Sequence, residues 1–275
     1  MTTTVDQALP VSVLDRVSLV LDAFDGPGRL TLAQIVRRTG LPRSSAHRML
    51  ERLVQLRWLR RNDRDYELGM RLIELGSLAV HQDQLHEAAL PLLHDLHQAT
   101  GLVAHLAVLD GNDVVLVEKV GGRMAMAIPT RVGGRHPAFC SGVGKALLAY
   151  NRHDPVDLSV RKTRFSISSA MQLDGELAKV RDHGFAFDRE ELFNGFGCVA
   201  APIGTPGQAV AAVSVCGPMS AMKFDPRLVA PVRMIATGIW RGLRGAAHRA
   251  APTPHEPRPL SRLAPNSPRT HLRAG

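Results

Sequence analysis

The first quarter of the chain repeats apolar residues at the spacing of short helices. Residues 12–25, 31–39 and the segment after Leu41-Pro42 each carry such a stripe. Thr31 is suited to cap the second helix, and Gly40 stands where a residue with positive φ would end it. The pattern therefore predicts two helices around a tight turn, packed on a first helix. The buried stripe after the turn is predicted to be Ala46, Leu50 and Leu53, with Met49 and Leu56 beside it.

Two short strands and a longer helix are expected next. Residues 58–61 and 66–68 favour strands around a turn at 62–65, a hairpin of the kind called a wing. Residues 69–81 then predict a linking helix. Its apolar content exceeds what a solvated linker requires, so we expect a dimer contact or packing against the next helix, at 83–100.

Beyond Gly101 the pattern changes to strands, beginning with a hairpin of 102–109 and 113–120. An antiparallel sheet with helices on its faces is the simplest assembly, so the predicted fold class is α+β. Further helices are expected at 142–150, 174–183 and 225–247, and strands at 123–129, 184–187, 197–203 and 209–215. The expected domains are a winged helix-turn-helix at 11–68, a linking helix at 69–82, a sheet domain at 83–247 and a disordered, basic, proline-rich tail at 248–275.

The helix after the turn presents a polar, basic outward face. In a helix-turn-helix, the N-terminal residues of this helix contact base edges. Arg43 and Ser44 lie beside the helix N-terminus, which attracts phosphate, whereas Arg48 is suited to bind a guanine and Ser45 the DNA backbone. Arginines of the wing are expected on phosphate or in the minor groove. The expected DNA contacts are Arg43, Ser44, Ser45, His47, Arg48, Arg60, Arg61 and Arg64.

Charge favours a nucleic-acid partner over a helical hairpin with a merely solvated basic face. Between residues 29 and 64 there are ten arginines and two acids, a local excess of eight. Such a field attracts DNA regardless of its sequence. The whole chain has a formal charge of +9, of which the tail from 248 contributes four.

Other residue patterns exclude several classes of protein. Cys140, Cys198 and Cys216 lie far apart in the chain and indicate neither a disulfide framework nor a zinc site. His94 and His97 have the spacing of two metal ligands but lack a third, so we expect surface histidines, no metal and no cofactor. Because no signal region and no run of about 20 apolar residues occurs, we expect a cytoplasmic protein without a membrane partner.

Several fragments in a fixed order resemble one protein family. They are TGLPRSSAHRML in the helix-turn-helix, YELG at the end of the wing, and then CSGVGKALLA, DREELFNGFGCVAAPI and AAVSVCGP. Each is weak alone, but together, from about residue 11 to about residue 245, they resemble the IclR family of bacterial transcriptional regulators. The resemblance implies a winged helix-turn-helix joined to a GAF-like domain that binds a small-molecule effector. It also implies a homodimer or homotetramer on double-stranded operator DNA.

A ligand site is expected where a glycine-containing loop enters the helix at 142–150. The free N–H groups and positive end of that helix suit a carboxylate, although the glycines could serve only tight packing. The loop is no nucleotide P-loop, because Ala146 follows the lysine where Ser or Thr would be needed. The chain departs from its relatives at Cys216, where serine is common, and at Phe196, where leucine is frequent. The resemblance implies effector contacts and apolar walls from Ala125, Ile128, Gly142, Val143, Asp188, Phe196, Cys198, Ser214 and Cys216.

Asp188 limits the chemistry of such a ligand. Two carboxylates in a closed pocket repel each other unless one is protonated or the ligand offers a hydroxyl. A hydroxy-acid, a keto-acid or a phenolic acid therefore fits better than a bare acid. Glu190 and Glu191 are interpreted as surface charges. Cys198 is interpreted as a core thiol, since no motif brings a histidine to it.

The leading hypothesis is a ligand-responsive repressor that binds a palindromic operator as a dimer or a pair of dimers and senses an organic acid. Two alternatives remain open. One is a DNA-binding protein without an effector, supported only by the basic tail. The other is an enzyme that uses Cys140 or Cys198, for which no set of nucleophile, base and orienting group is recognisable.

Overall fold

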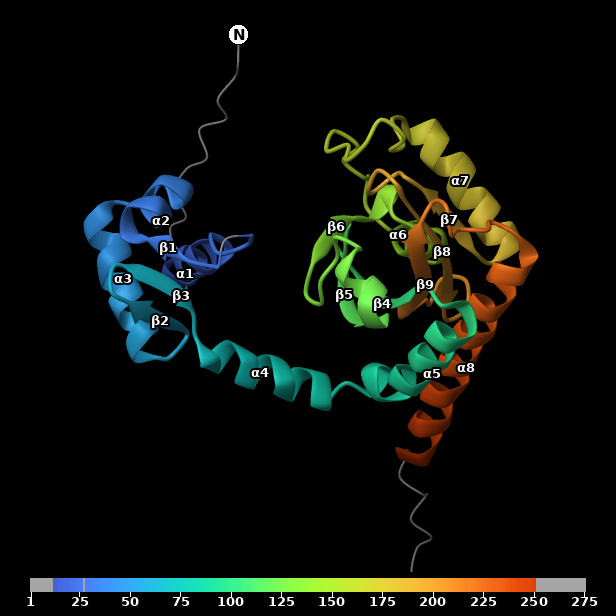
Figure 1. Ribbon diagram of the computed structural model, residues 1–275, viewed down its shortest axis with the longest axis horizontal. Helices are drawn as coiled ribbons and strands as arrows, with labels where there is room; N and C mark the ends of the chain where they lie inside the picture. The colour runs from blue at the N-terminus through green and yellow to red at the C-terminus, as the bar shows by residue number, and fades with distance from the viewer. Residues whose placement is uncertain (1–11, 27, 251–275) are drawn as a thin grey trace, which may run out of the picture. The chain divides into compact units, whose positions relative to one another are not determined.

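The computed structural model describes residues 12–26 and 28–250 of the chain (Figure 1). The chain divides at Pro91 into two compact units, which are described separately. The basic tail was expected to be disordered from 248, but residues 248–250 belong to the last helix; the rest, from 251 onward, lies outside the described residues. In the described ranges, no helix is both long and apolar enough to cross a membrane.

The first unit combines short helices with a small antiparallel sheet in the order β1-β3-β2. Leu30 pairs with Tyr66 and Leu59 with Leu68, so β3 is the central strand. The two-residue strand β1 was not predicted, because so short a segment carries no periodicity. The elements are α1 (Val13–Asp22), β1 (Leu30–Thr31), α2 (Leu32–Thr39), α3 (Arg43–Gln55), β2 (Leu59–Asn62), β3 (Asp65–Leu68) and α4 (Met70–His81).

Caps and apolar packing fix the helix-turn-helix as the sequence predicts. The Thr31 hydroxyl accepts a hydrogen bond from the Gln34 N–H at 3.3 Å, and the Gln34 side chain accepts one from the Thr31 N–H at 2.7 Å. Gly40 ends α2 with a φ of 69°. Leu50 is fully buried. Leu56, expected at the edge of the buried stripe, is instead 45% exposed; it is the C-cap after α3 and not part of the helix.

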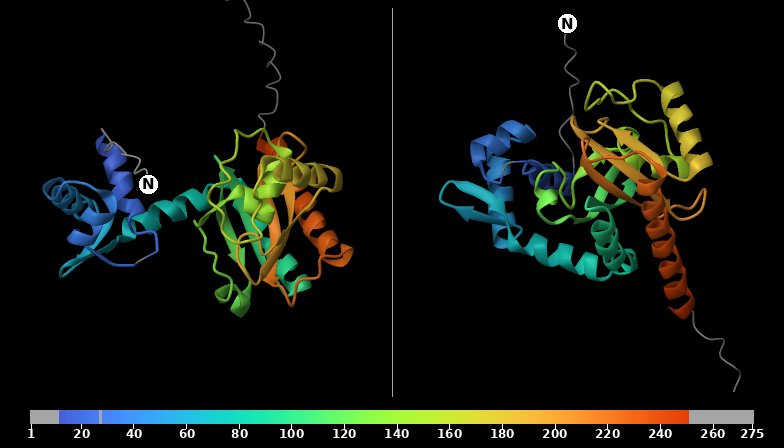
Figure 2. Two further views of the ribbon diagram at one scale, coloured as in Figure 1. Left: turned by 90° about the horizontal axis from the view of Figure 1, so that it is seen from above. Right: turned by 45° about the vertical axis from the view of Figure 1, so that its right-hand side comes forward.

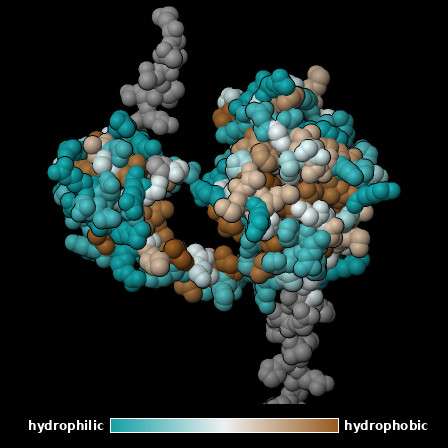
Figure 3. Space-filling model, in the orientation of Figure 1, coloured by the Kyte–Doolittle hydropathy of each residue, from teal (hydrophilic) through white to brown (hydrophobic). Residues whose placement is uncertain are grey.

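Helix α4 begins at a fixed position on the wing. The Gly69 N–H donates to the Trp58 carbonyl at 2.7 Å, and a Cβ on Gly69 would lie 2.2 Å from the Arg57 carbonyl oxygen. Glu74 binds Arg57 at 2.6 Å and Arg71 at 2.8 Å. These contacts hold the start of α4 against the base of the wing. Apolar residues nevertheless stay exposed along α4 (Figure 3), namely Met70, Ile73, Leu75 and Leu78.

The second unit is built on an antiparallel sheet whose described strands follow the order β6-β5-β4-β9-β8-β7. Helix α5 (Gln84–Thr100) spans the division at Pro91 and enters this unit. The remaining elements are β4 (Val103–Asp110), β5 (Asp113–Val120), η1 (Gly122–Met126), β6 (Arg135–Pro137), η2 (Ala138–Cys140), α6 (Gly142–Tyr150), α7 (Ala170–His183), β7 (Ala186–Arg189), β8 (Phe196–Ile203), β9 (Ala211–Pro218) and α8 (Pro226–Ala250).

Helices cover both faces of this sheet (Figure 2). A Cβ on Gly142 of α6 would meet Cys198 and Ala200 of β8, whereas one on Gly197 would meet Phe224, just before α8. Residues at even and odd positions of a strand point to opposite faces, so α6 and α8 lie on opposite sides of β8. Helix α7 packs on α6. The cavity described below lies on the α6 side.

The prediction of a strand at 123–129 is wrong. Residues 122–126 form the 3₁₀ helix η1, which Gly122 starts with a φ of 51°. The Ala127 N–H then donates to the Met124 carbonyl at 3.0 Å. The place beside β5 is taken by β6, which was not predicted. A short apolar run such as RMAMAIP does not by itself distinguish a strand from a helical turn.

The other predicted elements are present with shifted ends. Helix α7 begins at Ala170, not at 174, because the Ser169 side chain caps it by accepting from the Gln172 N–H at 3.2 Å. Gly184 ends it with a φ of 75°. Helix α6 has the predicted ends.

Candidate functional site

The outward face of α3 carries residues that were expected to contact DNA. Arg43, Ser44, His47 and Arg48 are exposed, and Ser45 is half-buried. Within the described ranges, Arg43 and Arg48 have no ion-pair or hydrogen-bond partner for their side chains. Both guanidinium groups are thus available to a phosphate or a base edge.

The wing arginines differ in how they are held. Arg60 donates from Nε to the buried carboxylate of Glu67 at 2.6 Å. Arg61 binds Glu51 on α3 at 3.1 Å, which ties the wing to the helix. Arg64 at the tip has no such partner in the part of the chain that the structure describes. Arg60 and Arg61 are therefore oriented before any DNA is bound, whereas Arg64 is not.

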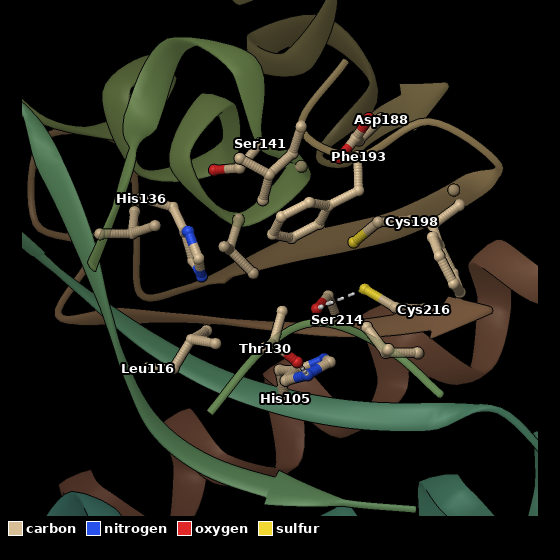
Figure 4. Close-up of a pocket in the computed structure, with 17 residues that line it drawn as sticks. His105, Leu116, Thr130, His136, Ser141, Asp188, Phe193, Cys198, Ser214 and Cys216 are labelled. Carbon is tan, nitrogen blue, oxygen red and sulfur yellow. Dashed lines mark hydrogen bonds between the residues drawn. The ribbon is translucent and has the colours of Figure 1, made fainter. Parts of the chain in front are cut away.

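On the second unit, residues from all six strands of the sheet and from α6 surround one cavity (Figure 4). Asp188, Cys198 and Cys216 lie directly opposite one another across β7, β8 and β9, and Ser214 lies opposite His105 of β4. Residues two apart on a strand share a face, so both rows point to the α6 side. The space between the lining atoms and at the mouth of the cavity is about 490 Å³, part of it open to solvent.

The N-terminus of α6 borders this cavity. Ser141 caps the helix by accepting from the Gly144 N–H at 3.1 Å, and Ser141, Gly142 and Val143 all line the cavity. A Cβ on Gly144 would lie 2.1 Å from the Ala138 carbonyl oxygen, so tight packing explains that glycine. The backbone N–H groups at the start of the helix remain a suitable partner for a carboxylate.

The surroundings of Asp188 favour its protonated form. The residue is 5% exposed. Burial and the carboxylate of Glu191 raise the pKa of Asp188 to about 8, although Lys145 opposes them. The folded protein therefore holds the Asp188 proton at neutral pH. A protonated carboxyl group can donate a hydrogen bond to a ligand oxygen, so it does not repel a ligand carboxylate.

The prediction that Glu191 is a surface charge is wrong, whereas Glu190 is half-buried in an exposed turn. Lys145 of α6 is 1% exposed, and its Nζ lies 2.6 Å from Oε1 of Glu191. Glu190 has a φ of 62°, and its side chain accepts from the Gly195 N–H at 2.7 Å. This turn after β7 brings Glu191 back to α6, where the buried ammonium group requires a counter-charge.

Eight of the nine residues expected around an effector line the cavity, namely Ile128, Gly142, Val143, Asp188, Phe196, Cys198, Ser214 and Cys216. Ala125 is not among the lining residues, since its segment forms η1 and not a strand. Sequence reasoning missed nine further lining residues, which are His105, Val114, Leu116, Thr130, His136, Ser141, Leu192, Phe193 and Gly197.

The two missed histidines matter most for chemistry. His105 is 2% exposed, and its Nε2 lies 2.9 Å from the Thr130 hydroxyl. Its Nδ1 and the Nε2 of His136 are buried without a hydrogen-bond partner among the described residues. Burial also lowers the pKa of His136, which favours its neutral form. A polar residue within the apolar strand 102–109 was a signal that could have identified His105, whereas His136 lay outside every predicted element.

Neither Cys140 nor Cys198 is suited to act as a nucleophile, and the described residues provide no metal site. Burial, with the nearby Asp188 carboxyl, raises the pKa of Cys140 to about 12, so it stays a thiol. The pKa of Cys198 is raised as well. Among the described residues, no group of three His, Cys, Asp or Glu side chains could hold a metal ion.

Comparison with known proteins relates both units to one family. Residues 13–63 match the family model "IclR helix-turn-helix domain", and residues 77–241 match "Bacterial transcriptional regulator IclR C-terminal". The chain is 33% identical over 232 residues to the HTH-type transcriptional regulator BhcR of Paracoccus denitrificans, covering 80% of this chain and 82% of that protein. It is 29% identical over 209 residues to the transcriptional repressor IclR of Escherichia coli, covering 72% and 76%.

A solved structure also relates the chain to the IclR family. The crystal structure of an IclR homologue from Microbacterium hydrocarbonoxydans, complexed with 4-hydroxybenzoate, superposes with a TM-score of 0.73 at 30% identity and covers 85% of this chain and all of that one. The named relatives are transcriptional regulators and not enzymes. The chain has an α+β fold with a winged helix-turn-helix and a GAF-like sheet domain, and both parts match the family models. It therefore belongs to the IclR family of bacterial transcriptional regulators.

Proposed function

We propose that this protein is a repressor that binds a palindromic operator. Binding of a small hydroxy-acid in the cavity would change the affinity of the protein for that operator. The observation that carries the ligand class is the buried Asp188 carboxyl, whose raised pKa favours its protonated form, beside the N-terminus of α6. Such a pair provides a hydrogen-bond donor and free N–H groups, both of which suit a carboxylate.

The opposite side of the cavity supports a hydroxyl on the ligand. The unpartnered ring nitrogens of His105 and His136 can each donate to or accept from a hydroxyl, depending on the tautomer. Between these polar ends the walls are apolar, with Leu116, Phe193 and Phe196 among them. A flat, short molecule with a carboxylate at one end and a hydroxyl at the other would satisfy both ends. A related protein was crystallised with 4-hydroxybenzoate, which has this pattern.

The exposed apolar residues of α4 support a symmetric assembly. Ile73 is 66% exposed and Leu78 is 54% exposed, and such side chains on a helix favour association. A twofold-symmetric dimer would present two copies of α3 to two half-sites, which is why the operator should be palindromic.

Calorimetric titration of the full-length protein tests the ligand class. The panel is 4-hydroxybenzoate, benzoate, phenol and an aliphatic hydroxy-acid. We expect the strongest heat from a compound that has both groups, and weaker binding of benzoate and phenol, because each leaves buried polar groups unpaired. Equal binding of benzoate and its hydroxylated form would contradict the role given to the histidines.

A further inference from the structure

Two cysteines of the cavity face each other across neighbouring strands. Cys198 of β8 and Cys216 of β9 are direct partners in the antiparallel register. Their sulfur atoms point toward each other in Figure 4. Directly opposed residues of an antiparallel pair have Cα atoms about 4.5 to 5.5 Å apart, which lies within the roughly 4.4 to 6.8 Å that a disulfide spans. Both cysteines are free thiols in this structure.

The surroundings make the two thiols unequal. The interaction of the two thiols with each other raises the pKa of Cys198 and lowers the pKa of Cys216, and the nearby imidazole of His105 lowers the latter further. The Ser214 hydroxyl lies 3.9 Å from the Cys216 sulfur. Cys216 is thus the sulfur that more readily becomes a thiolate, and Cys198 is the thiol beside it that keeps its proton.

We propose that Cys198 and Cys216 form a redox-active pair in the cavity that a small hydroperoxide converts into a cross-strand disulfide. The site rests on the register of β8 and β9, on the direction of the two side chains and on the opening of the cavity to solvent. It is independent of which effector the cavity binds.

The reaction has two balanced steps. The Cys216 thiolate attacks the outer oxygen of the hydroperoxide, the O–O bond breaks, and the leaving alkoxide takes up a proton to give an alcohol and a sulfenic acid on Cys216. The Cys198 sulfur then displaces the sulfenic oxygen. An S–S bond forms, and the Cys198 proton leaves with that oxygen as water. Two thiols are oxidised and one hydroperoxide is reduced.

The disulfide would alter the side of the cavity that β7, β8 and β9 form. The row Asp188, Cys198, Cys216 lies under the start of α6, and a Cβ on Gly142 would come within 3.0 Å of the Cys198 sulfur. Drawing the two sulfur atoms together removes a hydrogen-bonding thiol from the side of the cavity that also carries Asp188. Oxidation should therefore weaken the binding of any ligand held there.

Peptide mass spectrometry of the full-length protein tests the proposal. Trypsin cleaves after Arg189 and Lys223 and at no residue between them, so both cysteines fall in one peptide, 190–223, while Cys140 falls in 136–145. After treatment with hydrogen peroxide and digestion without reductant, we expect peptide 190–223 to lose two hydrogen atoms. Dithiothreitol should restore them, and the Cys140 peptide should keep its thiol.

Variants and unfolding separate the pair from general thiol chemistry. Cys140→Ser should leave the disulfide unchanged. Cys198→Ser should trap a sulfenic acid on Cys216 that dimedone labels, whereas Cys216→Ser should leave Cys198 unlabelled. Because variants can misfold, the wild-type protein is also oxidised in urea, where the disulfide should form more slowly. Retention of both thiols in peptide 190–223, sulfonic acids without loss of the two hydrogens, or equal rates in folded and unfolded protein would overturn the proposal.

Discussion

Lys145 and Glu191 form a buried ion pair, 2.6 Å between Nζ and Oε1, that joins α6 to the turn after β7. Lys145 is 1% exposed. The pair fixes both the start of the helix and the segment that follows Asp188, and these two segments provide the carboxylate-binding side of the cavity. Its integrity should matter to stability and to binding together.

Replacing Glu191 by Gln should destabilise the protein by up to about 3–5 kcal/mol, because a buried ammonium group loses its nearer counter-charge and keeps only Glu176 at 3.9 Å. Urea unfolding at neutral pH measures the change. The matched control is Lys179→Ala, which removes an exposed partner of Glu176 at 2.7 Å and should cost less than about 1 kcal/mol. Equal losses in the two variants would mean that the buried pair contributes no more than a surface pair.

The raised pKa of Asp188 predicts how stability depends on pH. The pKa is about 8 in the folded protein and near its ordinary value of 3.8 when unfolded, so between these pH values the folded state binds more protons. The stability contributed by this group is present in full below about pH 4 and is lost as pH rises toward 8. Asp188→Asn cannot ionise. The difference in unfolding free energy, wild type minus variant, should therefore fall steadily from pH 4 to 8, and a flat difference would contradict the assignment.

The two groups of arginines should differ in what they give to DNA binding. Arg48→Ala should relax the preference for one base pair by about 1–3 kcal/mol, whereas Arg60→Ala should weaken all sequences evenly and reduce the salt slope by about 1. Binding to matched and single-substituted duplexes at several salt concentrations measures both quantities. Arg181→Ala, on α7 of the other unit, is the control and should change neither. The same pattern for Arg48 and Arg60 would contradict the division between base reading and phosphate binding.

Gly69 should be irreplaceable at the junction of the wing and α4. A Cβ there would lie 2.2 Å from the Arg57 carbonyl oxygen, so Gly69→Ala must displace the helix start and should cost about 1–3 kcal/mol. The control lies in the same helix. Gly76 has open space around it, and Gly76→Ala should stabilise the helix by about 0.5–1 kcal/mol. Thermal unfolding of both variants tests the two predictions. An unchanged melting temperature for Gly69→Ala would show that the start of α4 is not fixed against the wing.

Local signals made much of the fold predictable. Thr31 with Gln34 specifies the start of α2 and Gly40 specifies its end, and the start of α6 follows from Ser141 and the glycines after it. The segment at 123–129 was misassigned because its apolar run is short and Gly122, just before it, starts a 3₁₀ helix. Strand β6 has no periodicity of its own and exists only because it pairs with β5.

The residues that line the cavity could be predicted only where they belong to a motif of the family. His105 and His136 come from strands that no motif links, so only the sheet register brings them to Asp188. The same holds for Glu191, whose burial depends on the partner lysine 46 residues earlier in the chain. Long-range pairing of this kind leaves no mark in local sequence, which is why a buried acid was interpreted as a surface charge.

The most direct test of the central claim is the selection of bound sequences from random duplex DNA by the full-length protein, with and without a mixture of hydroxy-acids that includes 4-hydroxybenzoate. Wild-type protein should enrich a palindromic motif, and the acids should change its recovery. The Asp188→Asn variant should enrich the same motif with a weaker response to the acids. A flat distribution of sequences, or a motif whose recovery no acid changes, would contradict a ligand-controlled operator binder.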